Sequence, residues 1–265
     1  MKDELTDEKD ICLWLGDCLV EMDRIEDNSV DLILADLPYG TTACRWDVII
    51  PFDLLWKQYL RISKKTTPIV LFGSEPFSSL LRTSNLKMFR YDIIWNKKKP
   101  SNFQMMNFQP GRIHEVVSVF SKSPAVYCNN NHMNYYPVKT NIEPYTRKRS
   151  FYGSKNSTLR EGHTIKELGE KTRTTKHPVS IIEYSNANIK EKKHPTEKPV
   201  SVLEYLIMTF SKEESTILDN TMGVGSTGVA AKQLNRRFIG IEKEQKYYDL
   251  AVNRIVNETV WGSSL

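Results

Sequence analysis

Four consecutive residues, Asp36-Leu37-Pro38-Tyr39, directly follow an apolar run at residues 30–35. An acid, a proline and an aromatic residue that leave a buried strand can together receive a flat ring that carries an amine. The carboxylate and the neighbouring carbonyls accept the N–H groups, and the tyrosine stacks on the ring face. Because Asp and Pro also favour ordinary turns after strands, the tetrapeptide alone leaves ring binding and a simple turn open as interpretations.

A second motif lies near the C-terminal end, where residues 217–231 are typical of a strand, a glycine-rich turn and a helix. Such a turn lets the backbone approach a ligand closely, and the first residues of the helix offer free N–H groups. Its glycines match the spacing G-x-G-x-x-G, and Glu242 follows roughly 20 residues later at the end of another strand. An acid there would hold ribose hydroxyls, so this motif predicts a nucleotide-like cofactor.

The glycine motif has two other interpretations, a nicotinamide or flavin site and a purely structural turn. Chain order argues against the dinucleotide site, because that fold needs several strand–helix units after the fingerprint. The chain ends at Leu265, which leaves room for one strand and one helix after Gly228. The rest of the sheet must therefore come from the N-terminal half.

This order, with the tetrapeptide first and the cofactor loop last, resembles the permuted beta group of DNA amino-methyltransferases that use S-adenosylmethionine. The resemblance covers most of the chain outside its middle. Its segments are Gly16-Asp17-Cys18, Asn28-Ser29-Val30-Asp31-Leu32, Asp36-Leu37-Pro38-Tyr39-Gly40, His194-Pro195-Thr196-Glu197-Lys198-Pro199 with the apolar helix after it, the glycine loop, and Gly240-Ile241-Glu242.

Two positions depart from the commonest pattern of that family. Leu37 stands where a proline is usual, and Met222 stands where a phenylalanine is usual. The first change keeps the backbone carbonyl of position 37, and Met222 still offers an apolar cover for the cofactor. The class of enzyme that the resemblance implies is unaffected.

The resemblance implies an α/β fold with a Rossmann-like, seven-stranded, mostly parallel sheet flanked by helices, circularly permuted motif order and an inserted target-recognition region. We expect residues 1–120 to form the catalytic part of the methyltransferase domain, 121–193 the insertion, and 194–265 the cofactor-binding part. Residues 91–120 are expected to form the antiparallel edge. Apolar patterning predicts strands at 12–15, 30–35 and 68–72 and helices at 18–25, 54–63 and 76–84.

The exocyclic amine of adenine or cytosine is a poor nucleophile, because its lone pair is delocalised into the ring. We expect Asp36 and the Leu37 carbonyl to accept hydrogen bonds from the amine, Pro38 to complete the turn, and Tyr39 to stack on the extruded base. The methyl needs only an in-line approach of nitrogen at about 3 Å, so no metal is required.

The resemblance also implies a cofactor site for S-adenosylmethionine. Asp17 would contact the adenine, Glu242 the ribose, and Lys198 the carboxylate, although a lysine there also suits a solvated helix start. His194 and Glu115 match positions often seen in the family, but we assign them no chemistry. The remaining expected cofactor contacts are Cys18, Asp36, Asp219, Met222, Gly223, Gly225, Ser226 and Thr227.

Composition is consistent with a soluble enzyme, which we expect in the cytoplasm, and the resemblance implies a prokaryotic or phage-encoded one. The chain has 265 residues, of which 40% are hydrophobic, enough for one α/β core and a smaller attached unit. No apolar run reaches the roughly 18 residues of a membrane span, and the polar, acidic start is no signal peptide. The four cysteines, Cys12, Cys18, Cys44 and Cys128, form no CxxC pair, so we expect reduced thiols and no metal site.

Basic charge is concentrated in the middle of the chain. Residues 121–193 carry 14 Lys and Arg against 6 Asp and Glu, interleaved with Tyr, Phe and Asn. These residue types hold phosphates and read base edges, although a solvated surface loop has the same composition. We expect an insertion with weak secondary structure that recognises DNA. The run Lys97-Lys98-Lys99 either touches the phosphate backbone beside the base pocket or forms a solvated loop.

The sequence therefore predicts a site-specific DNA methyltransferase that acts on the N6 amine of a flipped adenine. The preference for adenine rests on Asp36, because the resembled cytosine-N4 enzymes more often have Ser at that position. The alternatives are a cytosine-N4 DNA methyltransferase, an RNA methyltransferase and a non-catalytic nucleic-acid-binding module. The expected partner is double-stranded DNA and not a membrane; a homodimer and a cognate restriction endonuclease are further hypotheses.

Overall fold

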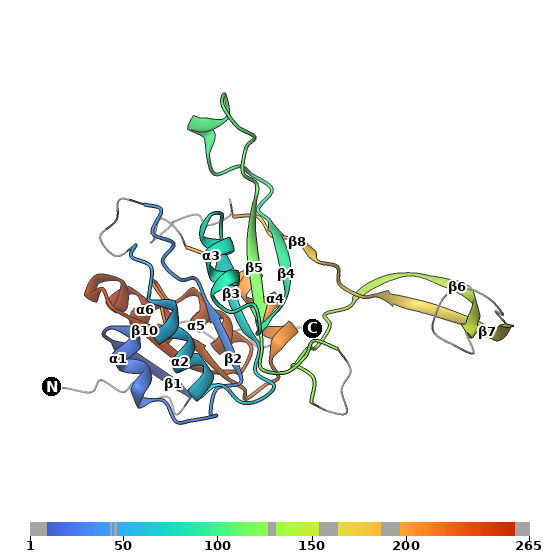
Figure 1. Ribbon diagram of the computed structural model, residues 1–265, viewed down its shortest axis with the longest axis horizontal. Coiled ribbons are helices and arrows are strands. Elements are labelled where there is room, and N and C mark those ends of the chain that lie inside the picture. Colours follow the sequence, from blue (N-terminus) through green and yellow to red (C-terminus); the bar gives the residue numbers. More distant parts are fainter. Residues whose placement is uncertain are drawn as a thin grey trace. The chain divides into compact units, whose positions relative to one another are not determined.

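A computed structural model describes residues 10–42, 44, 47–126, 131–153, 164–186 and 197–257 (Figure 1). Cys128 and His194 lie outside these residues. The chain divides into two compact units. One comprises the residues up to Tyr136 and from Ser180 onward, and the other is Pro137–Val179.

The larger unit contains the strands and helices predicted from the apolar pattern. Its strands are β1 (Ile11–Leu15), β2 (Leu32–Ala35), β3 (Ile69–Gly73), β4 (Phe89–Asn96), β5 (His114–Phe120), β8 (Ile181–Glu183), β9 (Thr216–Asp219) and β10 (Arg237–Glu242). Its helices are α1 (Cys18–Glu21), α2 (Phe52–Ile62), α3 (Phe77–Ser84), α4 (Val200–Phe210), α5 (Ser226–Gln233) and α6 (Gln245–Asn257), with the short 3-10 helices η1 (Met22–Arg24) and η2 (Phe103–Met105).

These strands form one mostly parallel sheet in the order β1-β10-β9-β2-β3-β5-β4-β8. Within this sheet as described, β5 alone runs antiparallel to its neighbours, β3 and β4. Both faces of β2 are covered, since Leu32, Ile33 and Leu34 are all fully buried. Helices α1, α2 and α3 contribute to the core on the face of Ile33, and α4 also contacts β2. The nearly continuous apolar run of β2 follows from this double burial.

The central pairing joins two strands that are far apart in sequence. Strand β2 pairs in parallel with β9, with Leu32 opposite Ile217 and Ile33 opposite Leu218. Parallel strands end at the same edge of a sheet, and ligands of open α/β sheets bind at that edge. The residues that follow β2 and β9 therefore meet there, as the permuted motif order requires.

The sheet differs from the sequence prediction at one side. We expected seven strands with an antiparallel edge at residues 91–120, but the described sheet has eight, and the edge strand is β8. Strand β4 runs parallel to the central strands because β5 reverses direction between β3 and β4. With three residues, β8 is too short for an apolar pattern to reveal.

The smaller unit also differs from the prediction of weak secondary structure. It consists of two long antiparallel strands, β6 (Thr140–Gly153) and β7 (Thr164–Lys176). Register shifts interrupt the pairing between Asn141 and Tyr145 and between Lys148 and Ser150. Among the described strands, each of the two pairs with no strand but the other, so their polar sequence needs no period-2 apolar stripe. Among the described helices, none is long and apolar enough to cross a membrane.

Candidate functional site

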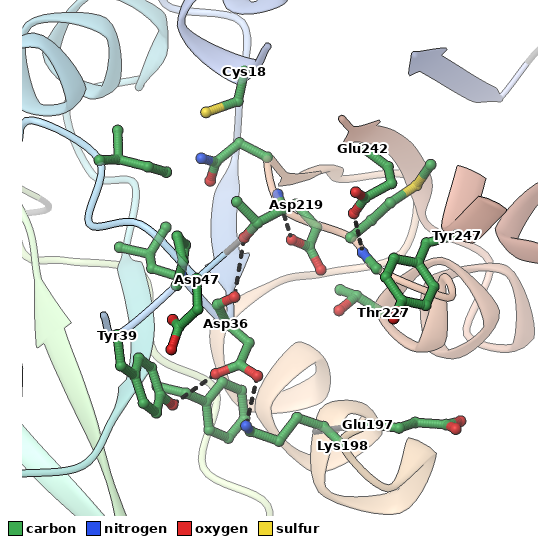
Figure 2. Close-up of a pocket in the computed structure, with 18 of the residues that line it drawn as sticks. Cys18, Asp36, Tyr39, Asp47, Glu197, Lys198, Asp219, Thr227, Glu242 and Tyr247 are labelled. Carbon is green, nitrogen blue, oxygen red and sulfur yellow. Dashed lines mark hydrogen bonds and ion pairs between the residues drawn. The ribbon is translucent and has the colours of Figure 1, made fainter. Parts of the chain in front are cut away.

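A pocket of about 520 Å³ opens at the carboxyl ends of β2, β9 and β10 (Figure 2). Its size falls within the range of about 300–1,000 Å³ that is usual for small-molecule sites. Asp36, Tyr39 and Lys198 lie together at one end, and Asp219, Thr227, Glu242 and Tyr247 lie together at the other. The tetrapeptide and the glycine loop therefore line one continuous cavity.

Asp36 directly follows β2 and is held at three atoms. Its Oδ1 accepts a hydrogen bond of 2.7 Å from the Tyr39 hydroxyl, and its Oδ2 accepts one of 2.6 Å from Lys198 Nζ. Its backbone carbonyl accepts a bond of 3.1 Å from the Thr221 hydroxyl, which belongs to the glycine loop. The two motifs are therefore joined by a direct hydrogen bond, and the orientation of the carboxylate is fixed.

Lys198 continues this contact into a chain of alternating charges. Its Nζ lies 3.3 Å from Glu115 Oε2, and Lys97 Nζ lies 3.1 Å from Glu115 Oε1. Lys97 also donates to the Ser101 hydroxyl at 3.1 Å. Lys198 and Lys97 are both almost fully buried. Charges removed from water in this way are tolerated because each has a partner of opposite sign.

The same ion pairs shift the pKa values of Lys198, Glu115 and Asp36. Burial opposes charge on Lys198, but the carboxylates of Asp36 and Glu115 outweigh it and raise the pKa of Lys198 to about 12. Burial also works against charge on Glu115, yet Lys198 and Lys97 lower the pKa of this carboxyl. At Asp36 burial prevails over Lys198, and the repulsion from Glu115 adds to it, so the pKa of Asp36 is raised.

Tyr39 presents a ring that is already part of a stack. It packs on Phe77 with a centroid distance of 4.8 Å and an interplanar angle of 23°. Burial and the nearby Asp36 carboxylate raise the pKa of Tyr39 well above its usual value, so its hydroxyl remains protonated and donates to Asp36.

Asp47 holds the loop that follows Tyr39. Its carboxylate accepts hydrogen bonds from the backbone N–H groups of residues 40, 41 and 42.

The glycine loop adopts the backbone conformation that its sequence demands. Gly223 and Gly225 have φ angles of 53° and 78°, in the left-handed region that favours glycine. A Cβ at Gly225 would lie 2.8 Å from Ile255 Cδ1, so this glycine also allows α6 to approach. A Cβ at Gly223 would meet no atom within 4 Å, which leaves open space above the turn. Met222 is buried and lies close to Gly240 of β10.

Two carboxylates line the far end of the pocket. Glu242 accepts from the Gly223 N–H at 2.9 Å and from the Glu244 N–H at 2.8 Å. Asp219 accepts from the Thr221 N–H at 3.1 Å. Burial raises the pKa of Asp219 to about 7, although hydrogen bonds from Thr227 and Thr221 oppose that shift. Burial likewise raises the pKa of Glu242.

The segments on either side of these acids complete the wall. Asp17 caps α1 by accepting from the Leu19 N–H at 3.0 Å, and Lys243 Nζ lies 3.2 Å from its other oxygen. Burial raises the pKa of the Cys18 thiol to about 11, so this cysteine is neutral. Glu197 pairs with Arg254 at 2.6 Å and accepts from the Ser226 hydroxyl, which fastens the segment before α4 to the start of α5.

The donors and acceptors around the pocket suit S-adenosylmethionine. Glu242 has lone pairs left for ribose hydroxyls, because each of its oxygens accepts one backbone N–H. The space above Gly223 admits a ligand against the backbone, and Met222 with neighbouring apolar side chains offers a surface for a purine ring. Among the described residues, no group of three or more His, Cys, Asp or Glu side chains could hold a metal ion.

Almost all the residues predicted from the sequence reach this one cavity. Gly225 alone among them is not a lining residue, and it acts by shaping the turn. The lining members of the predicted set are Asp17, Cys18, Asp36, Leu37, Pro38, Tyr39, Lys198, Asp219, Met222, Gly223, Ser226, Thr227 and Glu242.

Other lining residues were not assigned a role from the sequence. Asp47 and Glu197 fasten loops, Glu115 joins Lys97 to Lys198, and the buried Asn220 accepts from the Tyr59 hydroxyl at 2.6 Å. The sequence named Lys198, Glu115 and the lysine run separately, but it did not predict that they form one series of ion pairs. The first member of the run, Lys97, is buried, whereas Lys98 and Lys99 are exposed.

The raised pKa of Asp219 predicts a pH-dependent cost in stability. An unfolded aspartate ionises near pH 4 and the folded one near 7, so the penalty is absent below pH 4 and grows as the pH rises to 7. Asp219→Asn removes this titration and keeps an oxygen acceptor. We expect the variant to gain about 1–4 kcal/mol over the parent at pH 8, and almost none of that gain at pH 4.

Urea unfolding between pH 4 and 8, without cofactor, measures this difference. Asp249→Asn, at an exposed position of α6, is the matched control for the loss of one carboxylate. A gain for Asp219→Asn that does not change with pH would contradict the assignment of a buried, titrating carboxyl.

Comparisons with known proteins identify the family of the chain. The chain matches the DNA methylase family of N6 and N4 methyltransferases over residues 30–253. It is 30% identical over 271 residues to the type II methyltransferase M.HinfI of Haemophilus influenzae, covering 91% of this chain and 67% of that protein. It is 27% identical over 260 residues to the type II methyltransferase M1.MboII of Moraxella bovis, covering 91% and 94%.

Solved structures share the fold. The PvuII DNA methyltransferase, described as cytosine-N4-specific, gives a TM-score of 0.65 at 14% identity and covers 95% of this chain and 89% of that one. The M1.HpyAVI–SAM complex gives a TM-score of 0.58 at 21% identity and covers 94% and 100%. The chain therefore belongs to the N6/N4 DNA methylase family and is an S-adenosylmethionine-dependent DNA methyltransferase.

Proposed function

We propose that the protein transfers the methyl group to the N6 amine of an adenine that has been flipped out of double-stranded DNA. The observation that carries this proposal is the Asp36 carboxylate, fixed beside the Tyr39 ring in the pocket that also contains the glycine loop. A carboxylate accepts N–H bonds and cannot donate, so it suits an amino group. The ring of Tyr39, with Phe77 behind it, offers a face on which a flipped base stacks.

The residues of the chain then prepare the amine for attack. Asp36 and the Leu37 carbonyl accept hydrogen bonds from the amine. These bonds favour pyramidal geometry at the nitrogen and stabilise the positive charge that develops there. S-adenosylmethionine, when bound, supplies an electrophilic methyl group on a sulfonium. Because the amine must lie in line with that methyl, the fixed orientation of Asp36 provides much of the catalytic advantage.

We propose that Lys198 and Glu115 are positioning residues for Asp36. The Lys198 ammonium lies within 2.6 Å of the Asp36 carboxylate, which favours a role toward Asp36 over one toward the carboxylate of the cofactor. Lys198 favours the charged form of Asp36, and Glu115 disfavours it while holding Lys198 in place. The pair thereby adjusts the fraction of Asp36 that is ionised and able to accept the amine.

We propose that the opposite end of the pocket binds S-adenosylmethionine. Glu242 would hold the ribose, Asp17 and Cys18 the adenine, and Met222 would cover the ring. The turn at Gly223, with Asp219, Ser226 and Thr227, would surround the methionine portion. The support for these roles is the shared cavity and the free acceptor capacity of its carboxylates.

DNA recognition is proposed for the segment 121–193. Its two strands β6 and β7 form a ribbon, and a two-stranded ribbon fits the major groove of DNA. The bacterial type II relatives support the proposal that the enzyme acts in the cytoplasm. A homodimer and a cognate restriction endonuclease stay predictions.

A cytosine-N4 enzyme is the second candidate, because the PvuII enzyme described as cytosine-N4-specific shares the fold. Nucleoside mass spectrometry of unmethylated bacterial DNA, after incubation with the protein and methyl-labelled cofactor, separates the candidates. We expect N6-methyladenine. N4-methylcytosine would overturn the choice of base, and methylated RNA without methylated DNA would overturn the choice of polymer.

Asp36→Ala should lower methyl transfer by at least about 100-fold, because the acceptor for the amine is lost while the base stack remains. Cofactor affinity should change little, since Asp36 lies at the base end of the pocket. Product formation by mass spectrometry and cofactor binding by calorimetry measure the two effects. A variant with near-normal turnover would contradict the assigned role.

Lys198→Gln and Glu115→Gln should shift the pH–rate profile in opposite directions. Without Lys198 the Asp36 pKa rises, so the acid limb moves to higher pH and activity falls most at low pH. Without the Glu115 charge the Asp36 pKa falls, and the acid limb moves to lower pH. Single-turnover rates between pH 5 and 9 measure both limbs. Equal losses at every pH would indicate a merely structural role.

A further inference from the structure

The loop at residues 97–113, between β4 and β5, is held in a defined shape although most of it is exposed. The ladder of the two strands continues into its base, where the Lys97 N–H donates to the Ile113 carbonyl at 2.7 Å. Farther along, the Arg112 N–H donates to Asn102 Oδ1 at 2.6 Å, and the Asn102 side chain donates to the Pro110 carbonyl at 3.3 Å. Figure 1 shows the loop, with η2 in it, extending away from the sheet.

The tip of this loop is apolar where solvent exposure would favour polar residues. Phe108 is 85% exposed and Phe103 is 66% exposed, and Met105 and Met106 are each nearly half exposed. Four large apolar side chains within six residues make a contiguous exposed patch, unlike scattered single residues. We call these four residues the apolar tip.

The charge of the loop points to the chemistry of its partner. Residues 97–113 contain three lysines and one arginine and no acidic residue. Lys99 and Arg112 are exposed, as is Lys98, which pairs with Glu183 at 3.4 Å. An apolar tip flanked by cationic side chains is complementary to a polyanion that also offers stackable apolar rings.

The base of the loop belongs to the pocket already described. Trp95, Lys97 and Ser101 line the same cavity as Asp36 and Tyr39, and Lys97 is tied to Glu115. The apolar tip therefore projects from the end of the pocket that is proposed to receive the base. Nucleic acid whose base occupies that pocket has the adjoining strand next to this loop.

We infer that the apolar tip is a wedge that enters duplex DNA beside the target base and fills the gap in the stack. This inference rests on the proposed function, because the gap exists only if a base is flipped. Extruding a base removes its stacking contacts, at a cost of a few kcal/mol. Apolar side chains such as Phe and Met replace part of that contact when they insert between base steps. The cationic flank holds the neighbouring phosphates.

The test compares Phe103→Ala/Phe108→Ala with the parent protein on a duplex that contains the methylated site, mapped beforehand by sequencing. Leu86→Ala is the matched control, because Leu86 is 65% exposed and precedes β4, at the end of that strand opposite the loop. The wedge predicts a loss of at least about tenfold in kcat/KM for the double variant, with cofactor affinity unchanged. The control should stay within about twofold of the parent.

A second substrate separates the wedge from other roles. In this duplex the nucleotide opposite the target base is abasic, so extrusion is already cheap, and we expect the double variant to recover most of its lost rate. Met105→Gln/Met106→Gln, with side chains of similar length, should show the same loss and recovery. A loss without recovery, or no loss at all, would overturn the wedge.

Two further outcomes would contradict the wedge, one by giving the loop another role and one by overturning the proposed function. If sedimentation shows that the parent is a dimer and the double variant a monomer, the apolar tip binds a second copy of the chain and the wedge is wrong. If the parent protein methylates no duplex DNA, the proposed function fails and the wedge fails with it. Parent activity thus distinguishes failure of the function from failure of the wedge.

Discussion

For the proposed function, the aspartate at the end of the buried strand β2 must keep its negative charge while it is removed from water, and the contacts around Asp36 bear directly on that requirement. Burial alone disfavours the charge on Asp36. The Lys198 ammonium at 2.6 Å and the Tyr39 hydroxyl at 2.7 Å compensate for part of it, and both also fix the direction of the carboxylate. The buried Lys198 ammonium is in turn paired with the Glu115 carboxylate, and Glu115 is paired with Lys97. The burial of one carboxylate, to which we assign the proposed catalytic role, thus accounts for a series of buried ion pairs.

The parallel pairing of β2 with β9 supplies the geometry for this arrangement. It brings the end of one strand, where the base is proposed to bind, beside the end of another that starts the cofactor loop. The hydrogen bond from Thr221 to the Asp36 carbonyl joins the two ends. Motifs that lie far apart in the chain therefore share one pocket. On the proposed function, the spacing of neighbouring strands would set the distance between cofactor and base.

The sequence predicted the elements whose apolar residues or glycines follow a regular local pattern. Strand β2, doubly covered, and the glycine turn with its left-handed residues both follow from local residue types. The ribbon of β6 and β7 was not predicted, because the polar sequence of these strands carries no alternating apolar signal. The contact of Lys198 with Asp36 joins residues far apart in the chain, and the sequence alone offers no measure of that distance. The resemblance implied a contact of Lys198 with the carboxylate of the cofactor and left a solvated helix start open, and neither interpretation predicted the contact with Asp36.

The central claim is that one pocket holds the cofactor and the base with a fixed offset. A crystal structure of the protein with S-adenosylhomocysteine tests it most directly. We expect the ribose on Glu242 and the sulfur facing Asp36, with a gap that fits one methyl group and one amine. The amine nitrogen placed in that gap would lie about 3 Å from the methyl carbon and about 3 Å from the Asp36 carboxylate. A ligand whose sulfur faces away from Asp36, or whose ribose lies outside the reach of Glu242, would contradict the account.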